Sequence, residues 1–233
     1  RRDDLKLASA FSSSAGAAVY LMDAQAIDTE GYGLVAEQCK ALECETCLIQ
    51  NSVLAGAFVA NEGSLHLVDV TVTGVEPEPA SGLAMGVFAG SVEGLGAELS
   101  ADGLQVDDAG YAALWVEGAE VTLTNSTLEG GPRVELLPGV QAYGHALYVS
   151  GSSPVVTNST LQGAQGAGLF LNDAGATLSG LSFLDNSVDI HQQACSSEPI
   201  EPPEGVSATL CPEYDEPVLP MSFYGVVDLG GLQ

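Results

Sequence analysis

Apolar and polar residues alternate with a period of two in short runs that recur along the chain. Successive side chains of a β-strand point to opposite faces, so this alternation predicts half-buried strands. Glycines separate the runs, β-branched residues are frequent within them, and no longer window carries the apolar stripe of a helix. We therefore expect an all-β fold.

Two kinds of run repeat in a fixed order. In the first, a small residue precedes an apolar, an aromatic and a further apolar or small residue, as in 56–61, 86–90, 113–118, 146–151 and 168–173. The second follows about ten residues later and is clearest at 121–128 and 155–161, with looser copies at 48–54, 65–72 and 178–183.

The spacing of the first run sets the size of the repeat. Tyr148 and Phe170 are 22 residues apart, Val35 and Phe58 are 23 apart, and longer steps contain the inserts 76–81 and 130–139. A turn of about 22 residues with short strands matches one coil of a β-solenoid, whose neighbouring coils bury a continuous core. The sequence predicts a parallel β-helix over residues 1–190 and a separate proline-rich tail or cap over 191–233.

With these repeats, the chain resembles the pectate-lyase-like right-handed parallel β-helix superfamily over roughly residues 5–190. The copies Thr124-Asn-Ser-Thr-Leu128 and Thr157-Asn-Ser-Thr-Leu161 are the sharpest features of this resemblance. It implies a single-stranded, right-handed coil. The closing run 227–231 is also similar to the end of many bacterial secreted cell-surface β-helix proteins.

One strand position of each coil predicts an outward column. If Leu114, Val116 and their counterparts face inward, the residue between them faces out, and this column contains Val35 and the aromatic residues Tyr20, Phe58, Phe88, Trp115, Tyr148 and Phe170. The reverse parity would expose two aliphatic side chains per coil, which is the worse arrangement at about 25 cal/mol per Å². The column is either a stripe that docks a partner chain or stacks on sugar rings, or a surface that the inserts or the tail cover.

The Asn-Ser-Thr copies allow two interpretations. Asn125 and Asn158 are expected to share one coil position with Asn51 and Asp69, where their side chains can hydrogen-bond from coil to coil at a turn. Asn125 and Asn158 also match the acceptor pattern for N-linked glycans, which matters only in a host that glycosylates.

The charge of the chain narrows the choice of partner. Asp and Glu number 31 against five Lys and Arg, for a net charge of −26, which repels nucleic acid and anionic lipid headgroups. No stretch approaches the about 20 apolar residues of a membrane-spanning helix. We expect no nucleic-acid partner and no membrane insertion.

The cysteines point to an oxidising compartment. Cys195 and Cys211 bracket an irregular segment and are expected to form a disulfide that pins the tail. Cys39, Cys44 and Cys47 can hold one disulfide and a spare thiol, or supply three of the four ligands that zinc prefers. No histidine lies near enough in sequence to complete such a zinc site, so the sequence predicts the disulfide, no bound metal and an extracellular location.

Catalytic motifs are few. Polysaccharide lyases of this fold use basic residues and calcium, and here only Arg133 lies amid the central coils. The polygalacturonase-like hydrolases carry Asn-Thr-Asp, Asp-Asp, Gly-His-Gly and Arg-Ile-Lys. This chain matches only the middle two in part, through Asp107, Asp108 and His145, so those three residues form the rival, catalytic reading.

These observations lead to one expected function. The chain is interpreted as a non-catalytic, secreted or cell-surface adhesion module that binds a glycan or a protein. Self-association through the aromatic stripe or an open coil end is an alternative use of the same surfaces. No cofactor is expected, although calcium stays open because many carboxylates stand on a rigid scaffold.

Overall fold

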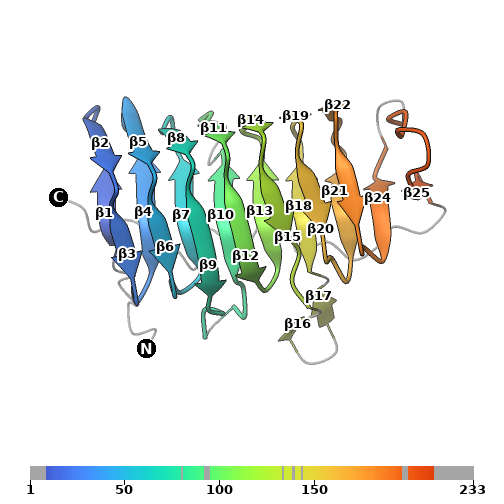
Figure 1. Ribbon diagram of the computed structural model, residues 1–233, viewed down its shortest axis with the longest axis horizontal. Helices are drawn as coiled ribbons and strands as arrows, with labels where there is room; N and C mark the ends of the chain where they lie inside the picture. The colour runs from blue at the N-terminus through green and yellow to red at the C-terminus, as the bar shows by residue number, and fades with distance from the viewer. Residues whose placement is uncertain are drawn as a thin grey trace.

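A computed structural model describes residues 9–79, 81–91, 95–132, 134–137, 140–142, 144–195 and 199–212, with the backbone alone at 134–137 and 140–142. Three parallel sheets, A, B and C, run along one long axis, and each coil gives one strand to each sheet in that order (Figure 1). Seven such coils stack in chain order before β24 (Val188–Gln193) begins an eighth. The prediction of an all-β parallel β-helix is confirmed.

Sheet A is the longest of the three and has nine strands. In order they are β1 (Ser9–Ser13), β4 (Tyr32–Glu37), β7 (Ala55–Ala60), β10 (Met85–Gly90), β13 (Ala112–Glu117), β18 (His145–Ser150), β21 (Ala167–Asn172), β24 and β25 (Ala208–Leu210).

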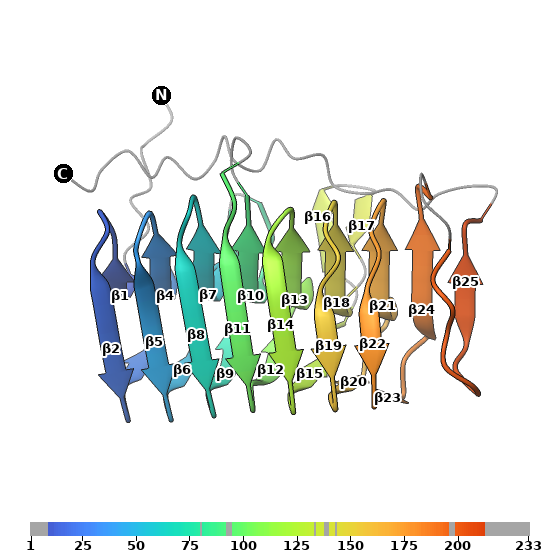
Figure 2. The same ribbon diagram turned by 90° about the horizontal axis from the view of Figure 1, so that it is seen from above.

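Sheets B and C have seven strands each and form the other two faces of the coil, as the view from above in Figure 2 helps to show. Sheet B contains β2 (Ala18–Met22), β5 (Ala41–Glu45), β8 (Ser64–Val68), β11 (Glu98–Asp102), β14 (Glu120–Thr124), β19 (Val155–Thr157) and β22 (Thr177–Ser179). Sheet C contains β3 (Gln25–Ile27), β6 (Leu48–Gln50), β9 (Thr71–Val75), β12 (Gln105–Ala109), β15 (Thr127–Glu129), β20 (Thr160–Gln162) and β23 (Ser182–Leu184). Between β15 and β18 the chain makes an antiparallel hairpin of β16 (Val134–Leu137) and β17 (Val140–Ala142).

The interior of the coil is a continuous column of aliphatic side chains from all three sheets. Leu114 and Val116 of β13 are completely buried in it, as are Leu147 and Val149 of the next coil. Inward parity of these positions, as the sequence predicted, is confirmed.

The small residue that opens each first run has a steric cause. A Cβ at Gly56 or Gly86 would overlap the Cγ1 methyl of Val72 or Val106, which projects inward from sheet C. In the later coil where sheet C supplies Leu128 in place of a β-branched residue, the same position holds Ala113. Side-chain shape on one sheet thus decides the residue on another.

Left-handed residues turn the chain at all three corners of the coil. At the corner between sheets B and C the residues with positive φ are Asp23, Thr46, Asp69, Gly103, Asn125, Asn158 and Gly180. Between sheets C and A they include Asp28, Asn51, Gly74, Asp108, Gly163 and Asp185. Gly, Asn and Asp tolerate this conformation best, which explains their regular recurrence.

Two sequence-based placements are wrong. Tyr20 is not in the aromatic column, because β2 belongs to sheet B, where Tyr20 pairs with Glu43; sheet A has Ser12 at that position of the first coil. Asn51 lies at the corner between sheets C and A, whereas Asn125 lies at the corner between sheets B and C. Both errors arise because different faces of one coil use the same local pattern.

Two disulfides join Cys44 to Cys47 and Cys195 to Cys211, and Cys39 is a buried free thiol. The predicted Cys195–Cys211 bridge is confirmed, as is the reading of the other group as one bridge with a spare thiol. Within the described ranges, no three His, Cys, Asp or Glu side chains are grouped so as to hold a metal ion. None of the described segments is a helix long and apolar enough to cross a bilayer.

Candidate binding site

The aromatic column lies on the outer face of sheet A, as predicted, but its rings are buried. Phe88 is 0% exposed and Trp115 is 4% exposed. With Phe58, Tyr148 and Phe170 they form a second apolar cluster, separate from the core inside the coil. Leu83, from the connection between β9 and β10, packs into this cluster. The rings therefore offer little open surface, and a binding role for the column stays a prediction.

The stack continues into two histidines near its C-terminal end. The ring centroid of Phe170 lies 4.6 Å from that of His145 and 5.0 Å from that of His191. Burial, with a smaller contribution from nearby His191, lowers the pKa of His145 from 6.5 to about 3. The neutral imidazole accepts a hydrogen bond at Nδ1 from the Ala167 N–H at 3.1 Å. His145 is thus a packed, neutral part of the stack.

The two aspartates of the rival catalytic reading lie on other parts of the coil. Asp107 is on the outer side of β12 and accepts a hydrogen bond from Gln105 Nε2 at 2.7 Å. Asp108 is exposed, and its φ of 57° makes the corner into sheet A. Among the described residues, neither carboxylate has a hydrogen bond or ion pair with His145. The structure does not bring the three residues together as a catalytic unit.

The repeated Asn-Ser-Thr motif forms a ladder in which serine has the buried role. The Asn125 amide donates to Asp102 Oδ1 of the preceding coil at 2.8 Å. The hydroxyl of Ser126 is buried, where it accepts the Leu104 N–H and donates to the Thr124 carbonyl. Ser159 repeats these contacts one coil later. The sequence pointed to the asparagines and missed the serines, whose hydroxyls satisfy buried backbone groups.

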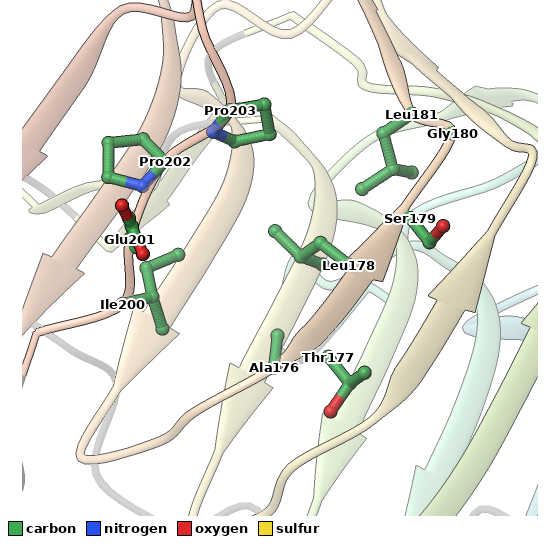
Figure 3. A pocket seen from close by; sticks show the side chains of 10 residues that line it. All are labelled: Ala176, Thr177, Leu178, Ser179, Gly180, Leu181, Ile200, Glu201, Pro202 and Pro203. Atoms are coloured by element: carbon green, nitrogen blue, oxygen red, sulfur yellow. The ribbon is translucent and has the colours of Figure 1, made fainter.

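A cleft at the C-terminal end of the coil is the candidate binding site (Figure 3). One wall is β22 with its flanking residues 176–181, and the other is the segment 200–203, which contains Pro202 and Pro203. The cleft has a volume of about 690 Å³, within the range of ligand-binding pockets. Neither the repeat pattern nor the motifs of the sequence indicated it.

A buried glutamine fixes the distance between the two walls. The Gln192 side chain is 1% exposed; its Nε2 donates to the Ala174 carbonyl at 3.1 Å, and its Oε1 accepts the Ile200 N–H at 2.8 Å. Ala174 leads into β22 and Ile200 begins the opposite wall, so one side chain joins both. Gln192 stands where the repeat pattern ends, but the burial and the contacts of its amide follow only from the fold.

The opposite wall is also anchored beyond the glutamine. The Cys195–Cys211 disulfide closes the stretch of chain that contains this wall. The Cys211 N–H also donates to the Gln192 carbonyl at 2.7 Å. The Asp189 carboxylate accepts both the backbone N–H and the hydroxyl of Ser207, at 3.0 and 2.8 Å. The wall is therefore held in place before any ligand arrives.

The wall formed by β22 is an unpaired sheet edge. In earlier coils the corner N–H donates forward, as Asn158 N does to the Ser179 carbonyl. Its equivalent in the last coil is the Gly180 N–H, and no described residue accepts it. The Thr177 N–H donates back to the Pro154 carbonyl and the Ser179 carbonyl accepts from Asn158, so the N–H and carbonyl of Leu178, between them, point forward and away from β19.

Comparisons with protein families, with curated proteins and with solved structures found no match to this chain.

Proposed function

We propose that this chain is a non-catalytic, secreted or cell-surface β-helix module that binds a glycan or protein partner. The observation that carries the proposal is the cleft at the end of the coil, with its walls joined by Gln192 and braced by a disulfide. A preformed cleft reduces the conformational entropy lost on binding, which is what a recognition site requires.

The lining of the cleft favours binding over hydrolysis. Glu201 is the only ionisable side chain among its lining residues, whereas glycoside hydrolysis commonly uses a pair of carboxyl groups across the substrate. The cleft thus offers shape, apolar surface and backbone hydrogen-bonding groups, with a single charge.

The proposed extracellular location has two supports. Disulfides persist in oxidising compartments, and this chain contains two. A net charge of −26 keeps an exposed rod soluble and separate from its neighbours. The repeats resemble those of the pectate-lyase-like superfamily, and we place the chain nearest to the bacterial cell-surface β-helix proteins of that kind.

A glycan array with the intact chain, with and without calcium, tests this function, followed by a reducing-sugar assay on every bound glycan. Binding to a glycan without sugar release is the expected result for a glycan partner, whereas silence on the array would point to a protein partner. Release of reducing sugar would overturn the proposal in favour of a carbohydrate-active enzyme, with Glu201 of the cleft as the first residue to replace. Calcium-dependent binding would assign the ion a role in adhesion.

A further inference from the structure

We propose that the cleft binds an extended peptide carrying a basic side chain, which adds to β22 as an eighth strand of sheet B. The inference rests on the proposed binding function and names the partner class for that same site. Its basis is the combination of an unpaired strand edge, an opposite wall that cannot pair with it, and one carboxylate.

The edge of β22 presents the backbone N–H and carbonyl groups that, in the earlier coils, hydrogen-bond to the next strand of sheet B. Leu178 offers an N–H and a carbonyl, and Gly180 offers an N–H, all directed forward from a strand whose backward side is paired with β19. An extended polypeptide is the ligand that matches such a row, since its own N–H and carbonyl groups repeat at strand spacing. Side-chain identity matters less to these bonds than backbone shape.

The opposite wall passes the edge without pairing to it. Pro202 and Pro203 have no backbone N–H, so this segment cannot supply the ladder of a further strand. In sheet A, by contrast, β25 pairs with β24 and covers the corresponding edge. The prolines thus leave a gap beside β22 while the Gln192 contacts hold the wall near it.

The dimensions of the cleft suit a short strand. Residues 176–179 run along the β22 side of the cleft before the corner at Gly180, which corresponds to about 13 Å of extended chain at 3.3 Å per residue. Leu178, Leu181 and Ile200 supply the apolar part of the lining, so a peptide side chain that points between them is expected to be apolar. Its neighbours in the peptide point outward, as alternation requires.

The charge of the cleft selects among possible strands. Glu201 stands on the proline wall, and Glu204 follows within the same exposed segment. A second copy of a chain with net charge −26 would bring like charge to these carboxylates. A lysine or arginine on the peptide instead gains a charge-assisted contact, so a basic peptide from another protein is the occupant that the site favours.

A displayed library of random octapeptides, panned against the full chain, provides the probe for this proposal. We expect enriched peptides that alternate apolar and polar residues and contain Lys or Arg. Glu201→Lys should weaken their binding by about tenfold, measured by fluorescence polarisation. Glu43→Lys is the matched control: it makes the same charge change on the exposed side of β5, five strands away in sheet B, and should alter affinity less than twofold.

Backbone methylation of the best peptide separates strand addition from other modes of binding. N-methyl groups on alternate residues remove the donors that face β22, and we expect a loss of about tenfold for each such position. Methylation of the other residues, whose N–H groups face the proline wall, should have little effect. The proposal would be overturned if both sets of methylated peptides lost the same affinity. It would also be overturned if Glu201→Lys and Glu43→Lys had equal effects, or if no peptide were enriched.

The glycan array distinguishes the failure of this inference from that of the proposed function. Adhesion to a glycan without any peptide binding would refute the strand site and leave the adhesion module intact. Sugar release would refute the proposed function, and the methylation result would still decide the peptide site.

Discussion

The outer face of sheet A and the edge of β22 differ in how far their side chains are buried and their backbone hydrogen-bonding groups are paired. The aromatic cluster around Trp115 is buried, and each of its strands pairs on both sides. The edge of β22 pairs on one side only and borders a cleft. In a solenoid, the side chains that look adhesive can belong to a second core, while the place where the repeat stops leaves backbone groups for a partner.

Replacement of Trp115 by alanine should have the largest effect on stability. Its ring lies 4.8 Å from that of Tyr111 and 5.0 Å from that of Tyr148, so truncation leaves a cavity in the aromatic cluster. We expect the free energy of unfolding in urea to fall by about 3–5 kcal/mol. Tyr20→Ala is the control, since Tyr20 is 54% exposed, and its effect should be about 0.5 kcal/mol. Equal effects would show that the cluster packs loosely.

Acid should weaken the same cluster through His145. Its pKa is about 3 in the folded chain and 6.5 as an ordinary value, so the unfolded chain binds the proton more readily. The stability that neutral His145 provides is complete above pH 6.5 and is lost as the pH falls toward 3.

The variant His145→Asn isolates this contribution, because its amide oxygen can still accept the Ala167 N–H. Between pH 7 and pH 4, the free energy of unfolding of the parent chain should fall by about 3 kcal/mol more than that of the variant. Parallel pH profiles would mean that the imidazole is solvated in the folded chain.

The cleft should respond to Gln192→Leu with a smaller loss of stability and a clear loss of binding. Leucine leaves the Ile200 N–H and the Ala174 carbonyl without their partner, a change worth about 1–3 kcal/mol. Gln25→Leu, on an exposed position of β3, makes the same change in chemistry and should be nearly neutral. If Gln192→Leu kept full peptide affinity, the glutamine would not be what sets the walls apart.

The sequence predicted the coil well and the site poorly, for physical reasons. Strand parity, the 22-residue step and the disulfide of the tail depend on local patterns, and residues such as Leu114 or Cys195 carry them directly. The placements of Tyr20 and Asn51 failed because three faces with similar alternation and three left-handed corners repeat within one coil.

The cleft depends on contacts that no local pattern encodes. Gln192 contacts Ile200 only because the chain turns back after β24. The aromatic column is buried, whereas the sequence allowed either an open binding stripe or a covered surface. The tail from residue 213 onward, with the run 227–231, lies outside the described residues, and so do the side chains of Arg133 and most of the insert 130–139.

A pair of glycine replacements makes the finest comparison between the middle of the coil and its end. Gly103 and Gly180 occupy the same corner, with φ of 72° and 64°, and a Cβ at either would meet the carboxylate or amide oxygen of the preceding coil's corner residue, Asp69 or Asn158. Alanine at each position should reduce the free energy of unfolding by about 1 kcal/mol because of the left-handed backbone.

Gly103 donates its N–H to the Thr124 carbonyl of the next coil, whereas no described residue accepts the Gly180 N–H, so the corner at Gly180 can shift toward the cleft. We therefore expect Gly180→Ala to destabilise the chain less than Gly103→Ala in urea, and hydrogen exchange to be faster at Gly180 than at Gly103 in the parent chain. The reverse order would mean that the last coil is held as firmly as the central ones, and that the edge of β22 is already covered.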